Sequence, residues 1–173
     1  MNHYLTADRH LGHPKVLEFE PDRKGFKATI KHNHIINEND ILYNLGDTGF
    51  NAEGKRLIEE DNANCKGKSI LVLGNHDTRS VSWYYDRGFD FVCRRFSIKL
   101  YGKQIVFTHY PVDVPDGVLN IHGHFHRFNH TLEEYKEVYP FYDLKSHILI
   151  TTENDCKPVN LKTVIEKYNR EYQ

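Results

Sequence analysis

The chain has 173 residues, of which 39% are hydrophobic and 27% are charged, and its formal net charge is −1. These values exclude a disordered chain, and no apolar run approaches the roughly 20 residues that cross a bilayer. We expect residues 1–173 to form one domain, since a chain of this length can bury its own core. The first residues lack a basic region followed by an apolar one, so we expect a cytoplasmic protein without membrane contact.

Cysteine and charge also limit the partners of the protein. The three cysteines, Cys65, Cys93 and Cys156, are widely spaced and odd in number, which predicts reduced thiols rather than a disulfide framework or a thiolate zinc site. The near-neutral charge provides no broad basic surface for nucleic acid. Histidine stands out with 12 residues, and histidine is the commonest metal-binding side chain.

The first half of the chain alternates predicted helices with predicted buried strands. The spacing of apolar residues predicts a helix over Phe26–Asn39, a strand over Ile41–Leu45 and a second helix over Ala52–Ala63. The fully apolar run Ile70–Leu73 predicts another strand. Helices that connect buried strands are typical of βαβ units, so we expect these strands to pair in parallel.

The second half changes to shorter, alternating strands. A Tyr-Gly-Lys turn separates Phe96–Leu100 from Gln104–Thr108, which predicts an antiparallel hairpin. Val118–Ile121 and Ile148–Ile150 provide further strands, and a closing helix is expected over Leu161–Tyr172, after a proline. The sequence therefore predicts an α/β core of two sheets with helices outside.

Five polar clusters follow the apolar runs. In open α/β folds, ligands gather beyond the carboxyl ends of strands, where loops present side chains without disturbing the core. We therefore expect the clusters to converge at one edge of the fold. They are Asp8-Arg9-His10, Gly46-Asp47, Gly74-Asn75-His76-Asp77, His109 and Gly123-His124-Phe125-His126.

These clusters hold the ligands that divalent cations prefer. Asp8 and His10 are two residues apart, so on an extended segment their side chains share a face, and the same holds for His124 and His126. Each cluster alone has an ordinary explanation: a strand end, an aspartate that caps a helix, or an asparagine turn. Together they offer more ligands than one ion can use, which favours two ions that share a carboxylate.

Two ions about 3.5–4 Å apart lower the pKa of a water between them and stabilise the attacking and leaving oxygens of a displacement. This chemistry matches hydrolysis of phosphomonoesters or phosphodiesters by a bridging hydroxide. Within the third cluster, the Asn75 amide oxygen can ligate and the His76 imidazole can move protons. The Asp77 carboxylate can hold the orientation of that imidazole.

The order and spacing of the clusters resemble the calcineurin-like metallophosphoesterases. The pattern of that family is Asp-x-His, Gly-Asp, Gly-Asn-His-(Asp/Glu), His and Gly-His-x-His, and all five blocks occur here in order between positions 8 and 126. The chain looks like the small, single-domain bacterial or phage branch. The resemblance implies a four-layer α/β/β/α sandwich of two mixed sheets flanked by helices. It also implies two divalent metal ions, with Mn²⁺ the expected activator and Fe or Zn compatible with the same ligands.

The resemblance also implies a role for each side chain. Asp47 would bridge the two ions. His76 would stay unligated as the proton donor or transition-state stabiliser, with Asp77 fixing its tautomer. The first ion would take Asp8, His10, Asp47 and His126, and the second would take Asp47, Asn75, His109 and His124.

Three further residues lie near these motifs, and two of them have two interpretations each. Arg9 stands where relatives carry a smaller or uncharged residue, and it either pairs with a carboxylate or clamps the substrate phosphate. His13 either borders the pocket or is a simple loop histidine. His122 neighbours Gly123 and points away from His124 by alternation, so we interpret it as structural.

Two other function classes stay open. A nuclease or RNA-processing phosphodiesterase would use the same chemistry on a polymer, and Tyr84, Tyr85 and Phe91 could offer stacking surfaces. The near-neutral charge argues against it. A non-catalytic, protein-binding scaffold on the same fold is disfavoured, because every ligand position of the pattern is present.

Overall fold

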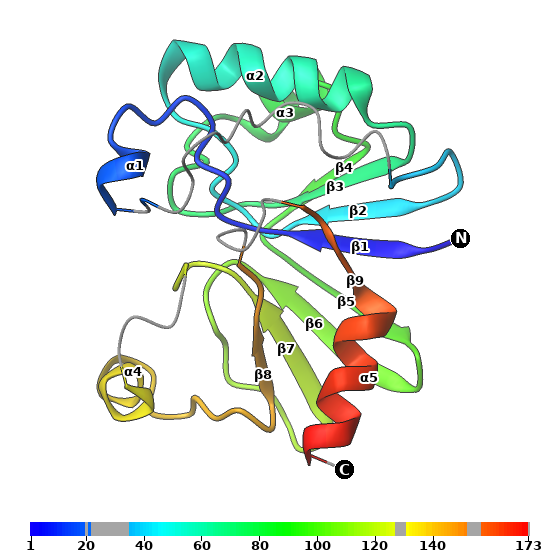
Figure 1. Ribbon diagram of the computed structural model, residues 1–173, viewed down its shortest axis with the longest axis vertical. Helices are drawn as coiled ribbons and strands as arrows, with labels where there is room; N and C mark the ends of the chain where they lie inside the picture. Colours follow the sequence, from blue (N-terminus) through cyan, green and yellow to red (C-terminus); the bar gives the residue numbers. More distant parts are fainter. Residues whose placement is uncertain (20, 22–34, 127–130, 152–156, 173) are drawn as a thin grey trace.

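Two β-sheets pack face to face in the computed structural model, which describes residues 1–19, 21, 35–126, 131–151 and 157–172 (Figure 1). The first sheet has the strand order β4-β3-β2-β1-β9 and the second the order β5-β6-β7-β8. The strands of the first sheet are β1 (His3–Thr6), β2 (Ile41–Asn44), β3 (Lys68–Val72), β4 (Phe91–Cys93) and β9 (Val159–Asn160). Those of the second are β5 (Arg95–Leu100), β6 (Lys103–Thr108), β7 (Val118–His122) and β8 (His147–Leu149).

Both sheets are mixed, as predicted. Strands β1 to β4 pair in parallel, and β9 joins β1 in the antiparallel sense. In the second sheet, β5 and β6 form the expected antiparallel hairpin, whereas β7 and β8 add in parallel. The strand directions matter for the site, because parallel neighbours bring their carboxyl ends to the same edge.

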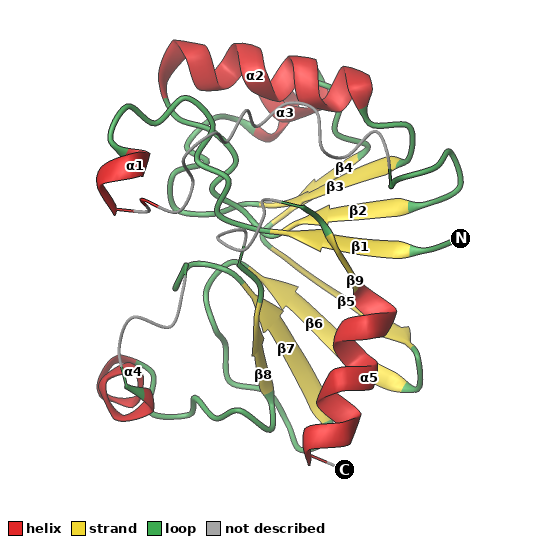
Figure 2. Cartoon of the chain, in the orientation of Figure 1, coloured by secondary structure: helices red, strands yellow, loops and turns green. Residues whose placement is uncertain are grey.

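The helices cover the outside of the sandwich (Figure 2). They are α1 (Val16–Phe19), α2 (Asn51–Asn64), α3 (Val81–Tyr85), α4 (Leu132–Val138) and α5 (Leu161–Tyr172). Helices α2 and α3 lie over the first sheet, and α5 lies beside β9 along one side of the second sheet. Their starts carry ordinary caps: the Ser80 hydroxyl accepts a hydrogen bond from the Trp83 amide, and Thr131 and Glu134 form a capping box.

Irregular segments cover much of the outer face of the second sheet. Asn120 and His122 point to that face, where Asn120 accepts a hydrogen bond from the Val112 amide at 2.9 Å. The His122 ring lies 3.2 Å from the Tyr142 hydroxyl. The four-layer order is therefore confirmed. Helix α4 and these irregular segments form the fourth layer, on the outer face of the second sheet. His122, fully buried, has the structural role that the sequence predicts.

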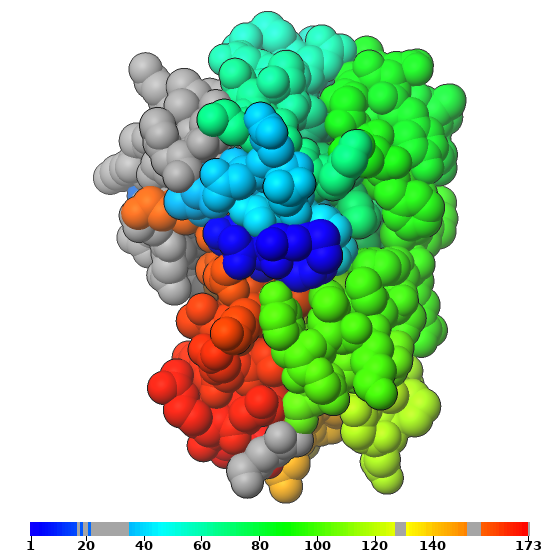
Figure 3. All heavy atoms as spheres, turned by 90° about the vertical axis from the view of Figure 1, so that its right-hand side faces the viewer, coloured from blue at the N-terminus to red at the C-terminus, as the bar shows by residue number. Residues whose placement is uncertain are grey.

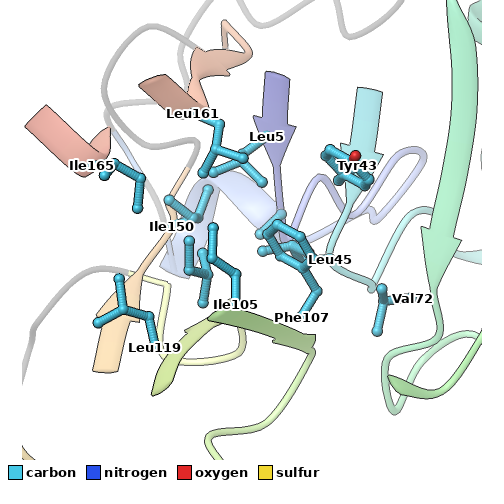
Figure 4. Packing of buried hydrophobic residues seen from close by; sticks show 12 residues of the cluster. Leu5, Tyr43, Leu45, Val72, Ile105, Phe107, Leu119, Ile150, Leu161 and Ile165 are labelled. Carbon is cyan, nitrogen blue, oxygen red and sulfur yellow. The ribbon is translucent and has the colours of Figure 1, made fainter. Parts of the chain in front are cut away.

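The core fills the space between the two sheets (Figure 4). Leu5, Tyr43 and Leu45 of the first sheet meet Ile105 and Phe107 of the second, and the Tyr43 and Phe107 rings stack with centroids 4.8 Å apart. Helix α5 closes the side of this core with two buried residues, Leu161 and Ile165. Burial of this kind contributes about 1.5–3 kcal/mol per large apolar side chain.

Most of the predicted elements agree with the structure. The hairpin and the closing helix are confirmed, and the predicted helix over residues 52–63 is α2. The helix expected over Phe26–Asn39 is not: residues 22–34 lie outside the described residues, and 35–39 form turns. Within the described ranges, every helix is too short or too polar to cross a membrane.

Candidate metal centre

The five polar clusters converge at the carboxyl ends of five strands. Three of them follow the parallel strands β1, β2 and β3, and the other two follow the parallel strands β6 and β7. The loops after β1 and β2 run side by side, since the Asp8 amide donates to the Gly46 carbonyl at 3.0 Å and the His10 amide to the Asp47 carbonyl at 2.9 Å. Figure 3 shows the side of the molecule that lies away from these loops, where β1 begins between the parts of the chain that form the two sheets.

Asp8, His10 and His126 form one compact group of ligand atoms. The Nε2 atoms of His10 and His126 lie 3.1 Å apart, and His126 Nε2 lies 3.9 Å from the Asp8 carboxylate. One ligand atom from each residue lies within 4.8 Å of the other two. Two imidazole nitrogens and a carboxylate oxygen that converge on one point are a donor set for a divalent cation such as Zn²⁺, Mn²⁺ or Fe²⁺.

Asp47 connects this group to a second one. Its Oδ2 atom lies 3.7 Å from His10 Nε2 and 3.4 Å from His109 Nε2. On the far side, His109 Nε2 lies 2.9 Å from the Asn75 Oδ1 atom. The Asp47 carboxylate therefore lies between His10 of the first group and His109 of the second.

A backbone carbonyl fixes the orientation of the His109 ring. Its Nδ1 atom lies 2.7 Å from the Leu45 carbonyl, which can only accept a hydrogen bond, so Nδ1 carries a proton and Nε2 faces Asn75 and Asp47. Backbone carbonyls orient metal-binding histidines in the same way. The His124 ring lies beside His109, with centroids 5.1 Å apart, but His124 is not in the compact ligand groups found among the described residues.

Glycines make room for the ligands in three of the motifs. A Cβ atom on Gly74 would lie 2.2 Å from Asp47 Oδ1, and one on Gly123 would lie 2.6 Å from Asp8 Oδ2. A Cβ atom on Gly46, whose φ is +98°, would lie 2.7 Å from His109 Nδ1. These contacts are too short for any side chain, so each glycine is needed for a ligand to reach its place.

The ligands themselves adopt left-handed backbone conformations. Such angles are uncommon outside glycine and cost of order 1–3 kcal/mol each, and they cluster at functional sites. They also correct one sequence-based argument: the paired ligands converge through local turns, not through alternation along extended segments. The φ angles are 49° at Asp8, 46° at His10, 53° at Asp47, 70° at His124 and 55° at His126.

Burial and attraction between carboxylates and imidazoles shift the pKa values of three side chains in the cluster. Burial raises the pKa of Asp8 to about 7, against the attraction of His109 and His126. Burial also acts to raise the pKa of Asp47, but the hydrogen bond and charge of His109 outweigh it and hold that pKa at about 2. Burial would lower the pKa of His109, yet its contacts with Asp47 and Asp8 raise it. The pKa values of Asp47 and His109 thus shift in opposite directions, as expected of a carboxylate and an imidazole that attract one another.

Metal binding is expected to release protons and to weaken as the pH falls. Both Asp8, with its pKa near 7, and His109, with its raised pKa, must lose a proton before they can ligate, so protons compete with the metal at pH 6 more than at pH 8. Calorimetric titration with Mn²⁺ in buffers of different ionisation enthalpy should show a net release of protons at pH 6.5. Equal affinity at pH 6 and pH 8 would contradict this arrangement.

Comparison with known proteins shows relatives without an assigned function. No family model matches the chain. The chain is 26% identical over 174 residues to the uncharacterized protein MJ1445 of Methanocaldococcus jannaschii, a match that covers 94% of this chain and 89% of that protein. The solved structure of the protein of unknown function AQ665 from Aquifex aeolicus superposes with a TM-score of 0.68 at 23% identity. That match covers 96% of this chain and 98% of AQ665, so the two share one fold.

A phosphoesterase from E. coli, YfcE, is a more distant structural match. It superposes with a TM-score of 0.41 at 19% identity, over 73% of this chain and 70% of YfcE.

His76 lies at the open side of the centre. Its side chain is 41% exposed, its Nε2 atom lies 4.0 Å from Asp47 Oδ2, and its ring contacts that of His10 with centroids 5.3 Å apart. The His76 amide donates to Asp47 Oδ1 at 2.8 Å. One residue thus positions the central carboxylate through its backbone and presents an imidazole to solvent. His76, His10 and Asp47 also form a third compact group of ligand atoms.

Asp77 has a different role from the one predicted. Its carboxylate accepts hydrogen bonds from the amides of Asp47 and Gly74 at 2.7 and 2.8 Å on Oδ2. Oδ1 accepts from the Thr48 amide at 3.1 Å and the Thr48 hydroxyl at 2.6 Å. Four donors from these loops saturate the carboxylate. Asp77 therefore fixes the loop that carries Asp47, and the expectation that it orients His76 is wrong.

Replacing Asp77 with asparagine is expected to destabilise the fold by about 3 kcal/mol. The new amide group would turn a donor toward backbone donors and leave buried N–H groups without an acceptor, each costing about 1–3 kcal/mol. Thermal unfolding of the metal-free protein measures the change. A variant with unchanged stability and a specific loss of turnover would instead restore the predicted partnership with His76.

Arg9 is buried rather than aimed at a substrate. It is 3% exposed and forms an ion pair with Asp61 of α2, in which Arg9 Nη2 donates to Asp61 Oδ1 at 3.1 Å. The guanidinium thus contacts helix α2 through Asp61. This placement supports the interpretation of Arg9 as the partner of a carboxylate and contradicts the phosphate clamp.

The Arg9–Asp61 pair can be tested by a double-mutant cycle. Arg9→Met and Asp61→Leu should each destabilise the protein by roughly 3–5 kcal/mol, because each removes one side of a buried ion pair and keeps the opposite charge buried. The double variant should recover a large part of that loss. Unfolding in urea measures all three. Single variants that keep full stability but bind substrate more weakly would instead favour the clamp.

Aromatic residues outside the five motifs form the rim of the candidate metal centre. The His13 ring lies against Phe50 with centroids 4.5 Å apart and near His10 at 5.9 Å, so His13 does border the centre. Tyr110 lies over the His124 ring, 4.2 Å between centroids, and is 40% exposed. Phe50 and Tyr110 each stand within three residues of a motif aspartate or histidine, which is the signal that could have found them.

Proposed function

We propose that the protein is a metal-dependent phosphoesterase with two divalent ions. The observation that carries this proposal is the place of Asp47: one buried carboxylate lies within 3.7 Å of imidazole nitrogens from two separate groups, with an exposed histidine beside it. Structural sites close around their metal, whereas catalytic sites keep an open position. The ordered motifs of the sequence support the same class of enzyme.

The residues present fit two ions. Asp8, His10, Asp47 and His126 would hold the first, and Asp47, Asn75, His109 and His124 the second. Burial lowers the pKa of His124 to about 4, so its imidazole is neutral at physiological pH, as a ligand must be. When bound, the ions would supply an activated water and charge stabilisation for the displacement. Mn²⁺ is the proposed activator, and Fe or Zn would satisfy the same oxygen and nitrogen donors.

The protein residues supply the remaining chemistry. The exposed His76 imidazole is placed to protonate the oxygen that leaves phosphorus or to donate a hydrogen bond to it. Asp77 and the Leu45 carbonyl keep the Asp47 loop and His109 in place. The conformations of these groups are thus set before substrate arrives, which is how an enzyme avoids reorganisation during the reaction.

Hydrolysis by metal-free and reloaded protein tests the proposal. Chelated protein should be inactive, and Mn²⁺ should restore hydrolysis of bis-p-nitrophenyl phosphate or p-nitrophenyl phosphate at about two ions per chain. The screen should extend to cyclic nucleotides and oligonucleotides, with Zn²⁺ and Mg²⁺ as further metals. Protein that binds two ions but hydrolyses none of these esters would be a scaffold, and the proposal would fail.

A polymer such as a nucleic acid is the second candidate substrate, and the structure weakens the support for it. Of the three aromatic residues expected to stack on bases, Tyr84 is 2% exposed and packs against Phe89, so it belongs to the core. Tyr85 and Phe91 are 43% and 45% exposed. The expected stacking surface is therefore reduced to two residues.

A further inference from the structure

A pocket of about 230 Å³ lies next to His76. Its wall comes from the loop after β2, from α2, and from the segment that leads from His76 into α3. Of the residues in the five motifs, only His76 lines it, so it is a separate space that shares His76 and the rim residue Phe50 with the candidate metal centre. The residues that matter for its chemistry are Phe50, Lys55, His76, Arg79, Trp83 and Tyr84.

The indole of Trp83 is held rigidly in this wall. The guanidinium carbon of Arg87 lies 3.7 Å from the Trp83 ring centroid, and Arg87 Nη1 donates to the Trp83 carbonyl at 3.1 Å. Arg87 is itself anchored to Glu59 by an ion pair of 3.0 Å. The edge of Trp83 meets Tyr84, with centroids 4.9 Å apart. A flat aromatic surface is therefore in place before any ligand binds, which reduces the cost of ordering it.

The charged residues of the pocket are cationic. Lys55 and Arg79 line it, and its described lining contains no carboxylate. The Lys55 Nζ atom lies 6.0 Å from the Trp83 ring centroid. If a flat ring bound next to the indole, a substituent of that ring would therefore lie close to the lysine ammonium group. An anionic group suits that position. Aromatic surface and positive charge together are the combination that binds nucleotides.

The pocket also lies on the correct side of His76 to receive a product. The ring of His76 contacts Phe50 with centroids 5.5 Å apart, and its Nε2 atom lies 4.0 Å from Asp47 Oδ2. The imidazole thus separates the carboxylate cluster from the pocket. A group that takes a proton from His76 as it leaves phosphorus would depart toward Trp83. The volume is below the roughly 300 Å³ of pockets for drug-sized ligands, which limits the occupant to one base-sized ring system with its nearest substituents.

We propose that this pocket binds the leaving group of the reaction and that the leaving group is a nucleotide. The inference rests on the proposed function. The substrate is then a phosphodiester in which one ester oxygen belongs to the ribose of a nucleotide. Water adds to phosphorus, the bond from phosphorus to that ribose oxygen breaks, and its electron pair stays on the oxygen. That oxygen takes the proton of His76, and the proton lost by the water restores the imidazole through solvent.

Fluorescence of Trp83 provides a direct test, because the chain contains a single tryptophan. The metal-free protein is titrated with AMP, which cannot be hydrolysed under those conditions. We expect a saturable change in emission. Adenosine lacks the charge and ribose 5-phosphate lacks the ring, so each should bind roughly tenfold more weakly. Equal affinity for AMP and either fragment, or no response to AMP, would overturn the inference.

Charge-matched variants separate the pocket from the rest of the surface. Lys55→Glu should weaken AMP binding roughly tenfold, whereas Lys99→Glu, at an exposed position of β5, should leave it unchanged. Trp83→Ala should lose binding by calorimetry and Trp83→Phe should keep most of it, with thermal unfolding as the check that both variants fold. Equal effects of the Lys55 and Lys99 variants would also overturn the inference.

A hydrolysis assay distinguishes failure of the pocket from failure of the proposed function. Turnover of bis-p-nitrophenyl phosphate without AMP binding overturns the inference and leaves the phosphoesterase in place. AMP binding without hydrolysis of any ester overturns the phosphoesterase, and the leaving-group role with it. A free nucleotide and a strand end share the same chemistry, so the dinucleotide pApA is compared with AMP. Tighter binding of pApA identifies a strand end, and equal binding identifies a free nucleotide.

Discussion

Replacing Asp47 with asparagine is expected to abolish turnover and to reduce the bound metal from two ions to fewer than one per chain. Asp47 is the carboxylate that lies between the two ligand groups, 3.7 Å from His10 Nε2 and 3.4 Å from His109 Nε2. A neutral amide cannot offset the charge of two divalent ions, and its NH₂ group would oppose them. The loss should therefore involve both ions, whereas a variant at the edge of the site would affect one.

Asparagine is an informative substitution at position 47 because it removes the charge of the side chain and keeps the local structure. The amide oxygen can still accept the hydrogen bond from the His76 backbone at the Oδ1 position. The metal-free variant should thus unfold at a temperature close to that of the metal-free parent. The parent should gain roughly 2.7 kcal/mol of stability at a metal concentration of 100 times Kd, and the variant should gain little.

Elemental analysis and thermal unfolding with and without Mn²⁺ measure the two effects of this change. Asp116→Asn provides the control, since Asp116 is exposed and lies outside the candidate centre. A variant that retains two ions and normal turnover would show that Asp47 is not the bridge.

The convergence of the ligands could be predicted because it depends on topology. Asn75 and His109 are 34 positions apart in the sequence, and their side-chain atoms lie 2.9 Å apart. Asn75 follows β3, which runs parallel to β2 and β4, and His109 follows β6, which runs parallel to β7 in the other sheet. Polar residues at the carboxyl ends of parallel strands gather at one edge of a sheet, and the contact between Asn75 and His109 joins the edges of the two sheets. The alternation of helices and strands predicted the two-sheet core in the same way, and the family resemblance implied that both sheets are mixed. Neither inference needed the detailed conformation of a loop.

The partners of individual polar side chains could not be predicted. Asp77 follows His76 in the sequence, which makes the two look like a pair. In the turn, the Asp77 carboxylate instead points back to the Gly74 amide and to the amides of Asp47 and Thr48, about thirty positions earlier. Hydrogen bonds between loops depend on left-handed residues such as Asp47, and no local pattern encodes that combination.

Short helices and strands could not be predicted from the sequence either. Strand β4 has three residues and β9 has two, and α3 has five. A helical or alternating pattern needs a longer window before it rises above chance. These elements depend on tertiary contacts: β9 pairs with β1 through Tyr4 and Leu5, and α3 is fixed by its Ser80 cap and by Tyr84 in the core.

Replacing His76 with alanine is expected to reduce turnover by about 10²–10⁴ while both ions stay bound. The loss should depend on the leaving group. An alkoxide or ribose oxygen leaves poorly without a proton, so nucleotide and alkyl esters should show the full effect. Nitrophenolate is stable as an anion, so bis-p-nitrophenyl phosphate should show a smaller one. Steady-state rates on both classes of ester, with metal content measured on the same samples, give the comparison.

The metal content decides between two roles that the geometry allows. His76 forms a compact group with His10 and Asp47 and lies 4.0 Å from the Asp47 carboxylate, so it could also act as a ligand. A ligand role predicts loss of an ion and equal loss of rate on every ester. His76→Asn then separates proton transfer from hydrogen bonding, since an amide donates a hydrogen bond but transfers no proton. If His76 protonates the leaving oxygen, the asparagine and alanine variants should be equally slow on alkyl esters; if it only stabilises charge, asparagine should recover part of the rate.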